Sequence, residues 1–92
     1  MTFWVISYDV PNNKRRRQIA KILEGHGQRV QYSVFECDLD ETKTSRLELQ
    51  LLREIDEKED DIRFYPLNRA DIERVRMLGR AELRRKQDYH IV

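Results

Sequence analysis

A carboxylate and a block of cations lie close together near the start of this 92-residue chain. Asp9 ends an apolar run, and a short proline- and asparagine-containing segment separates it from four consecutive cations, Lys14, Arg15, Arg16 and Arg17. Carboxylate oxygen is a ligand that Mg²⁺ and Mn²⁺ prefer, and guanidinium groups bind phosphate oxygens through paired hydrogen bonds. The combination indicates chemistry on a phosphodiester, in which a metal ion polarises the phosphate and activates water.

Both features also have a structural interpretation. An aspartate before a helix commonly accepts hydrogen bonds from backbone amides in a turn, and this reading of Asp9 stays open. The basic run covers a full helical turn, so it cannot be confined to one face, and many charge runs are solvated surface. A single Asp also supplies few ligands for a metal ion, whereas a two-fold dimer would supply two carboxylates.

The segment "QYSVF", residues 31–35, holds two aromatic side chains. Tyr32 and Phe35 could stack on bases, as on sheet-based RNA-binding domains. Core packing is the expected role for most of the apolar residues in this segment, and the aromatic-rich pattern of such RNA-binding domains is missing. Chemistry alone therefore leaves both roles open.

Other catalytic classes have little support. The only histidines, His26 and His90, have no neighbours suggestive of a nucleophile–base pair, and Cys37 is the only cysteine, so no disulfide can form within the chain. Zinc-like Cys/His spacing, a P-loop and a dinucleotide-binding glycine motif are all absent from the sequence.

Composition predicts one small folded domain. Charged residues make up 38% and hydrophobic residues 39% of the chain, with a net charge of +1. The charges are segregated, since residues 54–61 are mostly acidic while residues 14–17 and 80–86 are rich in cations, which predicts a polyanion-binding face opposite an acidic one. The apolar start lacks the features of a signal peptide and is too short to span a bilayer, so we expect a soluble cytoplasmic protein.

The order of elements predicts an α+β, ferredoxin-like βαββαβ fold with an extra C-terminal strand. The expected domain covers residues 1–80, and residues 81–92 form a tail that could add an edge strand for partner docking. The expected strands cover 3–9, 28–39 (one bulged or two short strands), 61–67 and 74–80, and a short turn or helix is expected over 69–73. A first helix is expected over 13–25, capped by Asn12 or Asn13. A second helix is expected over 45–57, with a Ser45–Glu48 capping box at its start and with Leu47, Leu51, Leu52 and Ile55 pointing inward.

The first expected strand is apolar on both faces. Alternate side chains point to opposite sides of a strand, and here both alternating sets are largely apolar. A sheet with helices on one face should be polar on the other unless something covers it. We therefore expect a homodimer with facing sheets; which face meets the helices, and so where Asp9 lies, stays open.

Three segments together resemble the Cas2 family, the small CRISPR-associated proteins of spacer acquisition. They are "FWVISYDVPNNKRRRQIAKILEGHGQRVQYSVFECDL" at 3–39, "RFYPL" at 63–67 and "VRMLG" at 75–79. The resemblance implies a ferredoxin-like homodimer that exchanges C-terminal strands. It also implies a prokaryotic, metal-dependent endonuclease acting on RNA or DNA, and a central dimer on which Cas1 integrase subunits hold a DNA duplex.

The resemblance also assigns residues. The family's metal-linked acid falls on Asp9, which would be catalytic and bind Mg²⁺, or Mn²⁺, beside its mate across the dimer axis. Its basic positions fall on Arg15, Arg16, Arg17 and Arg29, which with Lys14 form the expected nucleic-acid-binding set. Tyr8, Ser33 and Phe35 lie in the matching motifs as supporting residues. Some members have a second basic residue where this chain has Gln18.

Two functions follow from these expectations. One is an Mg²⁺-dependent endonuclease with paired Asp9 residues, whose substrate could be single-stranded RNA or DNA. The alternative is a non-catalytic DNA-binding scaffold within the Cas1 complex, for which the basic surface and the tail matter more than Asp9. A ferredoxin-like regulatory dimer and a ribonuclease toxin of similar fold are weaker alternatives.

Overall fold

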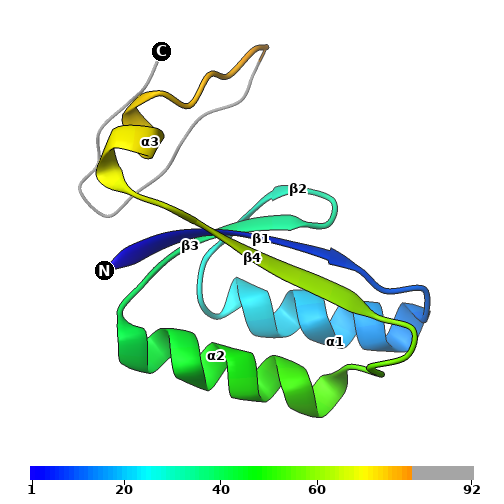
Figure 1. The fold of residues 1–92 in the computed structure, drawn as a ribbon. Helices are drawn as coiled ribbons and strands as arrows, with labels where there is room; N and C mark the ends of the chain where they lie inside the picture. Colours follow the sequence, from blue (N-terminus) through cyan, green and yellow to red (C-terminus); the bar gives the residue numbers. More distant parts are fainter. Residues whose placement is uncertain (80–92) are drawn as a thin grey trace.

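The computed structural model describes residues 1–79, so the expected tail over 81–92 and the boundary of the domain at residue 80 lie outside the described part. The described elements alternate strands and helices along the chain (Figure 1). They are β1 (Thr2–Asp9), α1 (Asn13–Glu24), β2 (Gln28–Gln31), β3 (Val34–Leu39), α2 (Glu41–Glu54), β4 (Asp61–Leu67) and α3 (Arg69–Glu73).

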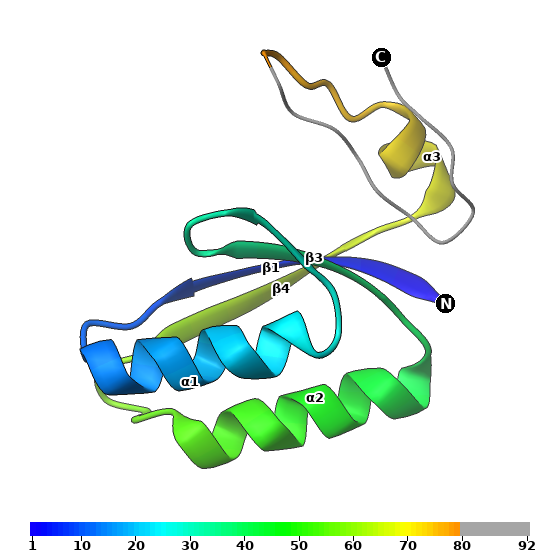
Figure 2. The ribbon, with the colours of Figure 1, turned by 180° about the vertical axis from the view of Figure 1, so that it is seen from behind.

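The four strands form one antiparallel sheet in the order β2-β3-β1-β4. The helices α1 and α2 cover the same face of this sheet, and α3 lies on the opposite side, beyond the end of β4 (Figures 1 and 2). The predicted α+β, ferredoxin-like arrangement is therefore confirmed. The segment 28–39 forms two strands, with a turn at Tyr32–Ser33 and a register shift between Arg29 and Gln31.

The first helix begins and ends where its sequence predicts. The Asn12 side chain accepts a hydrogen bond from the backbone N–H of Arg15 at 2.9 Å, which satisfies one of the helix's free amides. Gly25 follows the last turn and donates its own N–H to the Ile22 carbonyl at 3.1 Å. On the inner side, Ile19 and Leu23 are fully buried.

The start predicted for the second helix was wrong. The helix α2 begins at Glu41, because Asp40 is its N-cap and accepts a hydrogen bond from the Lys43 N–H at 2.8 Å. Ser45, the cap predicted from its spacing to Glu48, lies inside the helix. An Asp is at least as good an N-cap as Ser, so the earlier site starts the helix.

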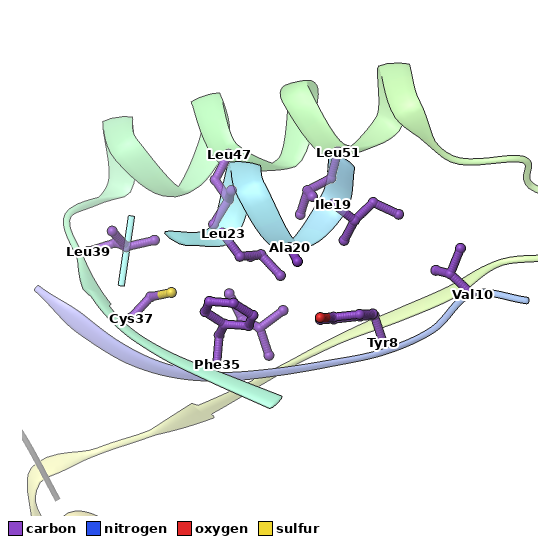
Figure 3. Close-up of a cluster of buried hydrophobic side chains, with 11 residues drawn as sticks. Tyr8, Val10, Ile19, Ala20, Leu23, Phe35, Cys37, Leu39, Leu47 and Leu51 are labelled. Atoms are coloured by element: carbon purple, nitrogen blue, oxygen red, sulfur yellow. The ribbon is translucent and has the colours of Figure 1, made fainter. Parts of the chain in front are cut away.

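The core lies between the sheet and the two long helices (Figure 3). Leu47 and Leu51 are buried there as predicted, and Ile55 is half-buried. Leu52, also predicted to point inward, is 54% exposed because the buried face of α2 runs through Thr44, Leu47 and Leu51. The cluster comprises Ile6, Tyr8, Val10, Ile19, Ala20, Leu23, Phe35, Cys37, Leu39, Leu47 and Leu51.

Cys37 sits in this cluster and is 1% exposed. Burial, with a smaller effect of the Glu36 charge, raises the pKa of its thiol to about 11. The thiol is therefore a core group in the folded chain, and its chemistry as a nucleophile is suppressed.

The strand predicted over 74–80 is not formed in its described part, residues 74–79. Arg74 caps the short helix α3, and the chain continues from there without regular structure. Within the described residues this segment has no neighbouring strand, and instead Met77 packs against a small second cluster around Phe3 and Ile72. This cluster covers one end of the sheet face that α1 and α2 leave free.

Candidate functional site

Asp9 ends β1 on the side of the sheet that faces away from α1 and α2, here called the open face. Ile6 and Tyr8 belong to the core under the helices, and the alternation along β1 places Ser7 and Asp9 on the other side. Asp9 is exposed. The face left undetermined by the sequence is thus settled, and Asp9 lies where a second molecule could reach it.

The open face places a second carboxylate opposite Asp9. Asp9 pairs with Asp61 in the register of β1 and β4, and Ser7 pairs with Arg63. The Arg63 Nε donates to an Asp61 carboxylate oxygen at 3.0 Å, and both side chains are more than half exposed. Directly opposed carboxylates repel each other, so this edge of the sheet favours a cation.

The exposed carboxylates at this edge suit a hydrated Mg²⁺ ion. Among residues 1–79 no group of three or more His, Cys, Asp or Glu side chains could enclose a metal ion. Mg²⁺, however, usually takes only one or two carboxylates and keeps several waters. Asp9, with Asp61 beside it, can supply that number on an accessible surface.

Arg15, predicted to bind phosphate, is instead tied to the acidic loop before β4. Its Nε lies 2.8 Å and its Nη2 3.1 Å from the two carboxylate oxygens of Asp60, and Nη2 also lies 3.1 Å from Glu59. The Asp60 side chain is fully buried and also accepts the Asp56 N–H at 2.9 Å. The paired hydrogen bond from Arg15 holds the pKa of the Asp60 carboxyl below its usual range.

Arg16 also bonds within the chain. It donates to the Val10 carbonyl at 2.9 Å and to the Asn13 side chain, so it braces the turn between Asp9 and α1. Lys14 and Arg17 are exposed, and neither forms an ion pair with any residue in the described range 1–79. Of the four consecutive cations, these two are therefore the ones best placed to meet a phosphate.

The remaining predicted residues gather between the sheet and α1. Arg29 reaches the Tyr8 hydroxyl with its Nη2 at 3.4 Å, and its guanidinium carbon lies 5.3 Å from the centre of the Phe35 ring. The Ser33 carbonyl accepts the Tyr8 N–H at 3.1 Å. Since Phe35 is fully buried, its role is to support Arg29 and the core, and it cannot stack on a base.

Sequence reasoning missed two residues of this region, Asp60 and Asp61. Both lie in the acidic run 54–61, which was expected on the face opposite the cations, and that expectation was wrong for Arg15 because Asp60 and Glu59 bind it directly. The available signal was that the acidic run ends at the first residue of the strand β4, but the contact between Arg15 and Asp60 joins residues 45 positions apart.

Comparison with known proteins gives a family match over most of the chain. The model of the family described as CRISPR associated protein Cas2 matches residues 1–75. The chain belongs to the Cas2 family. A Synechocystis protein named CRISPR-associated endoribonuclease Cas2 3 is 45% identical over 83 residues, which cover 90% of each chain.

Solved structures agree with this Cas2 assignment. A crystal structure of Streptococcus pyogenes Cas2 superposes with a TM-score of 0.74 at 41% identity, covering 84% of this chain and 99% of that one. A chain of a partial Cas6-RT-Cas1–Cas2 complex superposes with a TM-score of 0.76 at 33% identity, covering 85% and 91%. None of the helices within residues 1–79 has the length and apolar character needed to cross a bilayer.

Proposed function

We propose that this Cas2-family chain is a metal-dependent endonuclease of CRISPR spacer acquisition that cleaves RNA or DNA as a homodimer. The observation that supports this most is the position of Asp9, exposed on the open face and opposite Asp61. The name of the Synechocystis relative, an endoribonuclease, supports the same reaction class.

The residues of this chain have distinct roles in the proposed reaction. Asp9 from each copy would hold a Mg²⁺ or Mn²⁺ ion, which, when bound, polarises the scissile phosphate and lowers the pKa of water. Arg16 holds the turn that follows Asp9 through the Val10 carbonyl, and so limits the movement of the backbone next to Asp9. Lys14 and Arg17 would bind the phosphates on either side of the cleaved bond.

The proposal is tested by removing the metal ion. The purified chain should cleave a labelled single-stranded RNA, a single-stranded DNA or a duplex in Mg²⁺ or Mn²⁺, and excess EDTA should stop cleavage until the ion is restored. Cleavage that continues unchanged in EDTA would refute metal dependence, and binding without cleavage in either ion would refute the nuclease.

A second copy of the chain is the proposed partner of the open face. Around Asp9 this face presents half-buried apolar Val5 and Val34 and the exposed Tyr65, and the α3 cluster covers only its far end. It also contains Glu36, whose pKa is raised because the carboxyl is partly buried. An apolar surface interrupted by a few charges is typical of an interface between chains.

Replacing Tyr65 by Asp should therefore weaken the dimer. Tyr65 is 47% exposed on the open face, and a charge there would lose its hydration in the dimer, where the neighbouring Arg63 is already paired with Asp61. We expect at least about a tenfold increase in the dimer dissociation constant by analytical ultracentrifugation, with a parallel loss of cleavage.

Leu49→Asp is the matched control for this prediction. Leu49 is similarly exposed, at 56%, but lies on α2 on the other side of the molecule. If both variants changed the dimer equally, or neither did, the open face would not be the dimer interface.

A scaffold for Cas1 is the second candidate function. It is favoured by the likeness to a chain of the partial Cas6-RT-Cas1–Cas2 complex, and it needs the basic surface but not Asp9. Deletion of residues 81–92 should then weaken binding of Cas1 and leave the dimer intact, and a truncated chain that assembles fully with Cas1 would contradict a docking tail.

A further inference from the structure

Tyr32 stands at the tip of the β2–β3 turn and is 70% exposed. The other aromatic residue of the same segment, Phe35, is fully buried. Of these two side chains, Tyr32 is therefore the one that offers its ring to a ligand.

Contacts with Arg29 and Tyr8 hold Tyr32 in place. The guanidinium carbon of Arg29 lies 6.0 Å from the centre of the Tyr32 ring, within the range of a cation–π contact. The Tyr8 hydroxyl donates to the Tyr32 carbonyl at 3.3 Å, and Arg29 in turn donates to that hydroxyl. Tyr8 is buried and fixed by the core, so the turn and the ring above it are positioned before any ligand arrives.

A hollow of about 460 Å³ separates Tyr32 from α1. This volume suits a group the size of one nucleotide and is in the range of ordinary small-ligand sites, about 300–1,000 Å³. Its lining is mostly basic on the α1 side and aromatic on the sheet side. The lining residues are Tyr8, Arg16, Arg17, Ala20, Lys21, Glu24, Arg29 and Tyr32.

The cations of the hollow differ in availability. Arg16 is engaged with the turn after Asp9 and Arg29 with Tyr8. Arg17 and Lys21 are one helical turn apart on α1, and within residues 1–79 neither is in an ion pair. The single acid, Glu24, lies at the opposite end of this stripe from Arg17, so positive charge is concentrated near Arg17 and Lys21.

We propose that this hollow binds one unpaired nucleotide, with its base stacked on Tyr32 and its phosphate on Arg17 and Lys21. The inference rests on the proposed function in that it takes the ligand to be nucleic acid. Bases in a duplex are already stacked and paired, so they cannot enter the hollow, whereas a single strand or an unpaired end can. Tyr32 would thus make the chain prefer unpaired segments.

The test compares single-stranded and duplex ligands by fluorescence anisotropy, in EDTA to prevent cleavage. The probes are a 12-nucleotide RNA, a DNA of the same sequence and the corresponding blunt duplex DNA. Tyr32→Leu, which removes the ring but leaves apolar bulk, should weaken single-strand binding by about fivefold or more, the size of one base-stacking contact. Duplex binding should change by less than about twofold, and Tyr32→Phe should behave as the wild type in both.

A charge variant tests the phosphate side of the hollow. Lys21→Gln should reduce the slope of log affinity against log salt for single strands by about 0.7, the value expected for one lost phosphate contact. Lys43→Gln, an exposed cation on α2 outside the hollow, should leave that slope unchanged. Circular dichroism and the fluorescence of the half-buried Trp4 confirm that each variant is folded.

The outcomes separate this inference from the proposed function. If the wild type binds single strands and Tyr32→Leu binds them with the same affinity, the proposed nucleotide site is wrong and the proposed function is unaffected. Equal losses for single strands and duplex would also overturn it, because Tyr32 would then not distinguish them. A wild-type chain that binds none of the three probes would overturn the proposed function as well.

Discussion

The Asp9→Asn variant is expected to fold, dimerise and bind nucleic acid, and to cleave it at least about a hundredfold more slowly than the wild type. Asn has the shape of Asp but lacks the charge that holds a divalent cation. Metal ions contribute several kcal/mol of transition-state stabilisation, and each 1.36 kcal/mol changes the rate tenfold. Initial cleavage rates at saturating Mg²⁺ measure the effect.

Stability should not fall in this variant. Asp9 faces Asp61 across the β1–β4 pair, so neutralising Asp9 removes a repulsion between like charges. The thermal midpoint of Asp9→Asn should equal or slightly exceed that of the wild type. Inactivity through unfolding would instead lower the midpoint.

A matched acidic position provides the control. Glu41 is an exposed acid in the first turn of α2, on the helix side of the sheet, and Glu41→Gln should retain wild-type cleavage. Asp61→Asn shows whether the second carboxylate assists, since an intermediate rate would indicate that it contributes to the ion site. Wild-type cleavage by Asp9→Asn would reject the catalytic assignment of Asp9.

The Gly27→Ala variant is expected to be strongly destabilised. Gly27 connects α1 to β2, and a Cβ atom there would lie 2.3 Å from the Glu36 carbonyl oxygen and 2.4 Å from the Cys37 sulfur. The Glu36 oxygen and the Cys37 Cα, which would lie 2.9 Å away, are backbone atoms of β3, an inner strand of the sheet, so they cannot move without disturbing the strand. Overpacking of this kind costs about 3 kcal/mol, which lowers the melting midpoint of a domain this size by about 10 °C or more.

The neighbouring Gly25 is the natural control for this substitution. A Cβ at Gly25 would meet only the Ile22 carbonyl, at 3.3 Å, and its backbone is already helical. Gly25→Ala should therefore melt within a few degrees of the wild type when both are heated at the same protein concentration. If Gly27→Ala melted with it, the close approach of the α1–β2 connection to β3 would be wrong.

The local signals in the sequence were sufficient for β1, α1 and β4. The β-branched and aromatic run before Asp9 and the Asn12 cap each determine an element within a few neighbouring residues. The start of α2 was missed because Asp40 and Ser45 are both good caps, and local preference alone does not choose between them. The strand at 74–80 was predicted from composition, but a strand also needs a neighbour, and the described chain provides none there.

The candidate site was only partly predictable for a similar reason. Asp9 was identified, but its face depended on how β1 packs against α1 and α2. The four consecutive cations look equivalent in sequence, yet Arg15 is bound to Asp60 and Arg16 to the preceding turn, whereas Arg17 forms no ion pair with any residue of the range 1–79. These differences arise from contacts up to 45 positions apart, which spacing along the chain does not reveal.

The burial of Cys37 has a practical consequence for measuring how two copies of the chain lie in the proposed dimer. It is the only cysteine of the chain, and with a pKa of about 11 its thiol is almost entirely protonated at neutral pH. A cysteine introduced at the exposed Leu49 on α2, away from the open face, would therefore react first with a methanethiosulfonate spin label, without removal of Cys37. In a two-fold assembly, electron–electron resonance between the paired labels would then give the spacing across the axis in solution.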